Sequence, residues 1–329
     1  MRVTPSSQYV GFTRQVGRIQ AKKNAAQVRI SSGKEVINLS DSPEKVIDIK
    51  LFDKKISQND KYQDVLDMTL SELYNVDELL DGFTQILNQA RTVAVDAANE
   101  DSVSLQALGS YFRGYLEDLV QIANSDFQGH FLFAGTKTTV NSIEDASAGS
   151  SSEPFEIIKN NPTVENPSGL SVDFYGNNND RIINKSSKTT EKINLGASEL
   201  FGENQEVFSY LADLVNMTEY NEDGSKRGDQ DVFTQGDLTR LDKAQKGLMN
   251  SIMNINRLVA RNGTKVNRLE IMRTQLSDEN VRLMDYRSIR QDSDVAEAAM
   301  NLQREEYALQ YTLQVGARMN QISLFDFIR

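Results

Sequence analysis

The most regular pattern in this chain is an apolar residue at every third or fourth position, sustained through long stretches on both sides of its middle. Such spacing puts the apolar side chains on one side of an α-helix and is typical of helices that pack lengthwise. The longest unbroken run lies between residues 66 and 97. A second run extends from 241 to 276, with polar gaps at Gln245 and Asn262. The pattern therefore predicts two long, paired helices.

The N-terminal stretch carries the same pattern. Pro5 suits the first turn of a helix, and Gly33 offers a left-handed stop at its end. The positions at this spacing are Tyr9, Phe12, Val16, Ile19, Lys23, Ala26 and Ile30. They predict a helix with one apolar seam, interrupted by a single charge at Lys23.

The C-terminal stretch, residues 294–329, predicts a helix with two apolar stripes. Asp294 and Glu297 have the spacing of a capping box at its start. One stripe consists of Val295, Ala299, Leu302, Leu309, Leu313 and Gly316. The other consists of Met300, Tyr307, Tyr311, Val315 and Ile322, roughly 140° away around the helix. The chain then ends in an apolar tail that includes Leu324, Phe325 and Phe327.

Two stripes on one helix require two partners. The N-terminal seam is the natural partner of the first stripe, because both helices have similar lengths and each needs cover. The second stripe and the tail then remain for neighbouring molecules, since exposed apolar surface is unfavourable in water. We therefore predict that the seam, both stripes and the tail form an assembly interface.

The period changes in the middle of the chain. Residues 127–136 predict a hairpin or a strand, 155–158 and 170–175 predict strands, and 207–217 predict the one helix of this region. The predicted fold is mainly α: a long antiparallel helical bundle or coiled coil from both chain ends, with a small β-rich insertion and no continuous globular core. We expect a terminal coiled-coil domain (1–42 with 291–329), a helical rod (43–140 with 236–290) and an outer insertion (141–235). The expected breaks between the terminal helices and the rod are 31–42 and 285–292.

Composition excludes several classes of function. The net charge is −11, which argues against a general nucleic-acid binder and a polybasic membrane anchor. No run of about 18 apolar residues exists, so no membrane span is expected. Cysteine is absent and His130 is the only histidine, which excludes disulfides and cysteine or multi-histidine metal sites. No apolar signal core is visible at the N-terminus.

The sequence contains no strong candidate for a catalytic or ligand-binding site. Residues 31–34 look like the end of a phosphate-binding loop, but Val28 and Glu35 stand where that loop needs Gly and Ser or Thr. Residues 177–180 lack the spacing of a calcium loop and are better explained as a polar turn. His130 has no orienting carboxylate in the sequence. We therefore expect no enzyme activity and no cofactor.

At several places the sequence resembles the family of flagellins and flagellar hook-associated proteins. The resemblance covers residues 1–140 and 236–329, and its motif positions are Ser32, Gly33, Lys34, Asp41, Pro43, Phe133 and Gly135. The stretches 36–43 and 131–138, and the ending 323–328, are similar to the FlgL-type junction branch of the family. Leu39 and Ser42 depart from that branch, where Pro and Asp are usual.

The resemblance implies a structural protein of the bacterial flagellum that joins hook to filament. It implies export through the flagellar type III channel and an extracellular location. The implied partners are a FlgK-type junction protein, flagellin, copies of itself in a ring and an export chaperone, with no nucleic acid and no membrane insertion. Three alternatives stay open: a flagellin that forms the filament, an enzyme housed in the insertion, and a coiled-coil scaffold unrelated to flagella.

Overall fold

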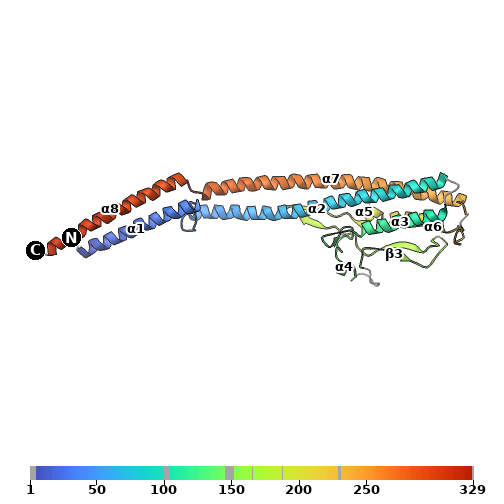
Figure 1. Cartoon of the computed structure of the whole chain (residues 1–329), viewed down its shortest axis with the longest axis horizontal. Helices are drawn as coiled ribbons and strands as arrows, with labels where there is room; N and C mark the ends of the chain where they lie inside the picture. Colours follow the sequence, from blue (N-terminus) through green and yellow to red (C-terminus); the bar gives the residue numbers. More distant parts are fainter. Residues whose placement is uncertain are drawn as a thin grey trace. The chain divides into compact units, whose positions relative to one another are not determined.

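The computed structural model describes residues 5–99, 104–144, 152–164, 166–186, 188–228 and 231–327. Within these ranges, most of the chain is helical (Figure 1). The long helices are α1 (Pro5–Ser32), α2 (Pro43–Asn99), α7 (Gln235–Gln291) and α8 (Val295–Phe327). The shorter helices are α3 (Leu105–Ala123), α4 (Val140–Glu144), α5 (Ala197–Phe201) and α6 (Glu206–Glu219). The mainly helical class with a β-containing middle is confirmed.

The strands pair in antiparallel two-stranded sheets. These pairs are β1 (Asp126–Phe127) with β2 (His130–Phe131), β3 (Phe155–Lys159) with β4 (Leu170–Phe174), and β5 (Ile182–Asn184) with β6 (Thr190–Lys192). The predicted hairpin is confirmed: Gln128 and Gly129 both have positive φ, as a tight two-residue hairpin turn requires. The sequence pattern missed β5 and β6, which are only three residues long and polar at several positions.

The chain divides into two compact units, one formed by Met1–Asp60 with Leu276–Arg329 and the other by Lys61–Gln275. We call them the terminal unit and the central unit. The three-domain organisation predicted from the sequence remains a prediction. The expected break at 285–292 is wrong in position, because α7 continues to Gln291 and only residues 292–294 separate it from α8. Residues 285–291 contain no Gly or Pro that would end the helix.

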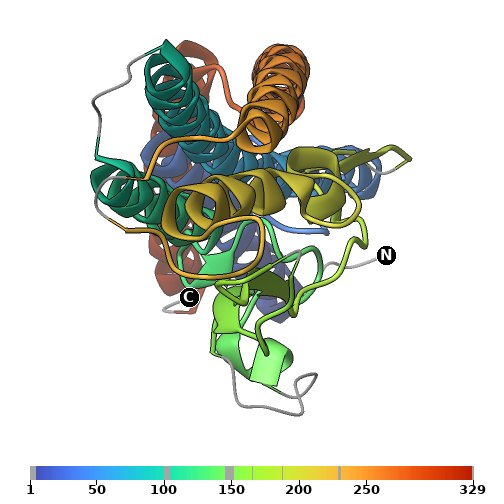
Figure 2. The same cartoon turned by 90° about the vertical axis from the view of Figure 1, so that its right-hand side faces the viewer.

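The central unit has a continuous apolar core, contrary to the expectation from sequence. The 3/4 positions of α2 from Leu66 to Ala97 are buried, as predicted. Aromatic rings from the insertion join them: Phe201 lies 5.2 Å from both Phe83 of α2 and Phe155 of β3, measured between ring centroids. Viewed end on, helix α6 lies beside α3 and covers this core (Figure 2). The insertion therefore completes the helical core instead of standing outside it.

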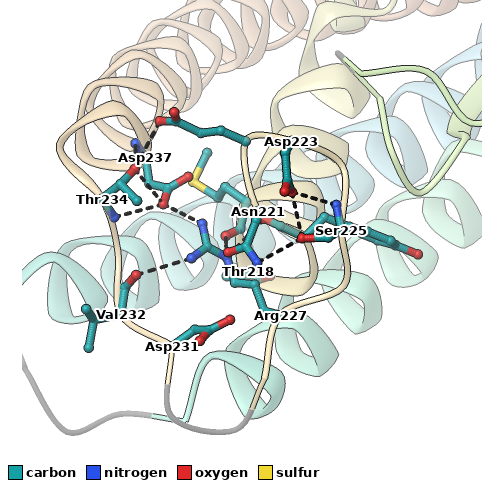
Figure 3. Close-up of polar contacts among 12 residues, drawn as sticks. Thr218, Asn221, Asp223, Ser225, Arg227, Asp231, Val232, Thr234 and Asp237 are labelled. Carbon is teal, nitrogen blue, oxygen red and sulfur yellow. Dashed lines mark hydrogen bonds and ion pairs between the residues drawn. The ribbon is translucent and has the colours of Figure 1, made fainter.

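A buried ion pair between Arg227 and Asp237 joins the loop that follows α6 to the start of α7 (Figure 3). The Arg227 Nε donates to the carbonyl oxygens of Met217 and Tyr220 at 3.0 Å, at the end of α6. Asp237 accepts hydrogen bonds from the backbone N–H and the hydroxyl of Thr234, both at 2.9 Å. Arg227 thus joins carbonyls at the end of α6, which have no partner within that helix, to the Asp237 side chain in the first turn of α7.

Candidate assembly surface

Helices α1 and α8 lie side by side and run in opposite directions within the terminal unit (Figure 1). Along α1, the described side chains with the least exposure follow the predicted seam. They are Phe12, Val16, Ile19, Lys23, Ala26 and Ile30. Tyr9, by contrast, is 59% exposed. The seam is therefore the covered side of α1 from Phe12 onward.

The covered side of α8 differs from the predicted stripe. It consists of Ala298, Leu302, Glu305, Leu309, Thr312 and Gly316, which keep an unbroken 4/3 spacing. Val295 and Leu313 belonged to the predicted stripe, but both are at least half exposed. A search for apolar residues alone passes over Glu305 and Thr312 and selects bulkier residues beside the true line. Leu302, Leu309 and Gly316 are the predicted positions that do lie on it.

The two helices pack closely at Gly316. A Cβ atom added there would overlap the end of the Phe12 ring. Gly316 is buried, and Phe12 is partly buried. A glycine inside a helix costs roughly 1 kcal/mol relative to alanine, and here it leaves room for an aromatic ring from the facing helix.

The charged interruption in the α1 seam has a partner across the pair. Lys23 Nζ lies 3.4 Å from Glu306, and its neighbour Lys22 lies 3.9 Å from Glu305. These charges meet at the same level of both helices. Ion pairs that are this exposed contribute little to stability, but the match at one level favours this register over shifted ones.

The opposite side of α8 is exposed and apolar. Four members of the second predicted stripe, Met300, Tyr307, Tyr311 and Val315, are all more than half exposed. The side chain of the fifth, Ile322, lies outside the described part of the structure. Arg304 lies between them on the same side, since residues three and four apart share a helix face. Tyrosine and arginine are enriched among the residues that dominate protein interfaces, so this face has the composition of a binding surface.

The apolar tail lies at the end of α8. Leu324, Phe325 and Phe327 fall within this helix, which extends to Phe327. Their side chains lie outside the part of the structure that is described. Their role in assembly therefore stays a prediction.

The motif around Gly33 forms the corner between α1 and α2. Gly33 has φ +67°, as a left-handed helix stop requires. Its carbonyl oxygen accepts a 2.9 Å hydrogen bond from Ser293 N–H, and Lys34 forms a β-bridge with Asp292. The Ser32 hydroxyl accepts a hydrogen bond from Lys34 N–H. The corner therefore ties the end of α1 to the start of α8.

Asp41 and Pro43 complete the corner. The backbone N–H groups of Asn38 and Ile37 donate to Asp41 Oδ2 at 2.8 and 3.1 Å, and these two bonds lower the pKa of this carboxyl. Pro43 is the first residue of α2, as predicted. Asp294 is the N-cap of α8, because its Oδ1 accepts hydrogen bonds from the N–H groups of Ala296 and Glu297.

The other motif residues belong to the central unit. Phe133 is fully buried against Phe83, with 5.6 Å between the ring centroids. Gly135 has φ +68°, and a Cβ atom there would overlap the backbone of Asn177. These residues support the fold of the insertion and are not part of the exposed surface.

The described residues provide no sign of catalytic chemistry. No group of three or more His, Cys, Asp or Glu side chains among them could hold a metal ion. His130 is exposed and lies 3.2 Å from the hydroxyl of Thr138. No helix in the described ranges is both long enough and apolar enough to cross a membrane.

Replacing Gly316 with alanine is expected to loosen the α1–α8 pair, because the new methyl group displaces the Phe12 ring. Limited digestion of the full chain with chymotrypsin would then cut faster after Phe12. Gly17→Ala is the matched control, since a Cβ there meets nothing within 4 Å. It should slow the cut by raising the helix propensity of α1. Equal cutting rates in both variants would contradict the proposed packing.

Comparison with known proteins relates this architecture to bacterial flagella. Residues 8–138 match the family described as the bacterial flagellin N-terminal helical region. Over 99% of both chains, the sequence is 23% identical to flagellar hook-associated protein 3 of Escherichia coli strain K12. The similarity thus includes the C-terminal helices and the insertion.

Solved structures share the fold. Flagellar hook-associated protein 3 of Legionella pneumophila superimposes with a TM-score of 0.55 at 12% identity, covering 73% of this chain and 97% of that one. The FlgL protein of Bacillus cereus gives a TM-score of 0.50 at 21% identity, covering 74% of this chain and all of that one. At such identities the likeness establishes the architecture and nothing further.

Proposed function

We propose that this chain belongs to the family of flagellins and flagellar hook-associated proteins and is a structural subunit of the junction between the flagellar hook and filament. The similarity to flagellar hook-associated protein 3, both of Escherichia coli and of Salmonella typhimurium, extends over almost the whole length of both chains. A filament-forming flagellin, the alternative, is therefore not favoured.

The observation that carries the proposal is the exposed stripe on α8, which lies opposite the side that packs on α1. Met300, Tyr307 and Tyr311 are each more than half exposed on a helix whose other side is already occupied. A stripe of this kind is unfavourable for an isolated molecule. Assembly with other subunits would cover it, together with Tyr9 and the apolar tail.

The partners follow from this position. A subunit between hook and filament would contact a FlgK-type junction protein on one side, flagellin on the other and copies of itself within a ring. An export chaperone would cover the α8 stripe before assembly. The chain would leave the cell through the flagellar type III channel and reside in the extracellular flagellum. The absence of cysteine fits such a route, because no disulfide has to form or be broken.

Deleting the gene is expected to leave hooks without attached filaments, with flagellin released into the medium. Electron microscopy of isolated hook–basal bodies and immunoblots of the medium would measure this. Expression of the intact chain from a plasmid should restore filaments. Filaments that attach firmly to hooks in the deletion strain, but are fewer or thinner, would instead favour the flagellin alternative.

A further inference from the structure

We propose that neighbouring copies of this chain pair through two oppositely charged edges of the central unit, the acidic edge of α2 in one copy meeting the basic edge of α7 in the next. This inference rests on the proposed function, because it assumes that copies lie side by side. It adds the surface through which they do so.

In the middle of α2, every charged residue is acidic. Between residues 62 and 90 this helix has six acidic residues and no lysine or arginine. Four of the acids lie on one edge of the helix, at positions that follow the 3/4 spacing. We call this edge, formed by Asp64, Asp67, Ser71, Tyr74, Glu78 and Asp81, the acidic stripe. All six residues are exposed. Asp67 pairs with Arg273 of α7, so the charges of Asp64, Glu78 and Asp81 are the ones that face solvent in the isolated chain.

Helix α7 has the opposite character. Between residues 243 and 269 it has six basic residues and no acidic ones. Four of them share one edge at the spacing 4, 4 and 3. We call Arg257, Arg261, Lys265 and Arg268 the basic stripe. Three of the four are exposed and Lys265 is half-buried.

The two stripes lie on opposite edges of the α2–α7 pair. On the acidic side, the Tyr74 hydroxyl donates to Glu270 of α7. On the other side, Glu72 of α2 pairs with Arg181, which lies beside β5. Tyr74 and Glu72 are two residues apart, so they point in directions roughly 200° apart around the helix.

The basic stripe lies on the same side as Arg181. Arg268 pairs with Glu191 of β6, and Arg261 pairs with Glu199 of α5. Glu270, two residues after Arg268, points to the acidic side, again roughly 200° away. The pair of helices therefore has an acidic edge and a basic edge.

The basic stripe keeps unused positive charge. Glu199 is already shared by Arg261 and Lys192, and Glu191 by Arg268 and Lys185. Arg257 and Lys265 form no ion pair within the described residues. Burial beside Arg261 lowers the pKa of Lys265, with desolvation as the main cause. A carboxylate from outside the molecule would relieve this repulsion.

A second copy is the occupant that fits. The acidic stripe covers 18 residues and the basic stripe 12, which corresponds to about 25 and 17 Å between their first and last residues at 1.5 Å per residue. Contact between two identical edges would bring like charges together, whereas acidic against basic does not. Such a head-to-tail contact uses two different surfaces of each copy, and it generates a ring when the rotation closes. Exposed charges add little affinity, but they select the partner and its register.

Charge reversal in the full chain tests the pairing. The acid-reversed variant is Glu78→Lys with Asp81→Lys, and the base-reversed variant is Arg257→Glu with Lys265→Glu. None of these four side chains takes part in an ion pair among the described residues. Each variant brings like charges together in the assembly, so its amount on isolated flagella of the complemented deletion strain should fall at least about tenfold. The chain with all four changes should recover to near the wild-type amount.

The matched control is Glu117→Lys with Asp118→Lys, which makes the same charge change at exposed positions of α3. It should incorporate like the wild type. Normal incorporation of either reversed variant, or no recovery in the fourfold variant, would overturn the inference. Failure of the wild-type chain itself to appear on flagella would instead overturn the proposed function, so the two failures are distinguishable.

Discussion

Replacing Arg227 with methionine is expected to lower the free energy of unfolding of the central unit by about 3–5 kcal/mol. Arg227 and Asp237 are both almost completely buried, with side-chain exposures of 1% and 0%. Removing the guanidinium leaves a buried carboxylate whose remaining donors are the two groups of Thr234. Asp237 Oδ1 already lacks a hydrogen-bond partner within the described residues. The second carboxylate oxygen therefore does not compensate for the lost ion pair.

The same substitution also removes the groups that end α6. Arg227 donates to the carbonyls of Met217 and Tyr220 there, and to the carbonyl of Val232 at 3.2 Å (Figure 3). Its guanidinium lies 5.8 Å from the centre of the Phe233 ring. We therefore expect the damage to include loosening of the loop between α6 and α7 as well as the unpaired charge.

Urea unfolding of the full chain, followed by circular dichroism, measures this effect. Arg113→Met is the matched control, because Arg113 forms a 2.8 Å ion pair with Glu219 that is partly exposed and should contribute about 1 kcal/mol or less. The double variant Arg227→Met with Asp237→Leu should recover much of the loss, since removing both charges leaves no buried carboxylate. A loss in Arg227→Met that is no larger than in Arg113→Met would contradict the role of the buried pair.

The sequence predicts the long helices, and the covered sides of α1 and α2, because apolar spacing reflects burial directly. The seam of α2 from Leu66 to Ala97 and the stop at Gly33 follow from local chemistry alone. The polar gaps of α7 are also instructive. Gln245 and Asn262 lie within the seam and donate to backbone carbonyls of α2, at Ala94 and Leu73, both at 2.9 Å. The facing helix accepts from their NH2 groups, which spacing alone does not reveal, whereas Asn262 Oδ1 is buried without a hydrogen-bond partner among the described residues.

The sequence does not predict features that depend on what the facing element supplies. The covered side of α8 includes Glu305 and Thr312, which no apolar pattern selects. Gly316 lies there because the Phe12 ring of α1 occupies the space that a side chain at residue 316 would need. The sequence of α8 alone does not show this. Arg227 lies in a loop without periodicity, and only the Thr234-x-x-Asp237 spacing signals a helix start beside it. Tertiary contacts determine each of these positions.

The charged stripes show a different limit. Both are visible in the sequence as long intervals with charges of one sign. Their significance, however, depends on α2 and α7 packing side by side with the stripes on opposite edges. The sequence alone does not show which way either charged edge faces. In the net charge of the whole chain, the acidic and basic intervals largely cancel.

Replacing Leu309 with aspartate is expected to abolish incorporation into the flagellum while leaving the central unit folded. Leu309 lies in the covered line of α8 between Glu305 and Thr312, and it is one of the few large apolar side chains on that line. A carboxylate there must lose its hydration when α1 covers it, at a cost of several kcal/mol. The central unit does not contain Leu309, so its unfolding transition should not change.

The control for this prediction is Gln310→Asp, which adds the same charge at the adjacent, exposed position of α8. If the covered line governs assembly, Leu309→Asp is absent from isolated flagella, whereas Gln310→Asp is present at close to the wild-type level. If exclusion depends only on negative charge in α8, both variants are lost, and the seam has no special role. Incorporation of Leu309→Asp at the wild-type level would show that α1 and α8 do not pack along this line in the flagellum. The two positions are neighbours on one helix, so both variants should affect helix propensity and export of the chain to a similar extent. Burial of the substituted position is the property that distinguishes them.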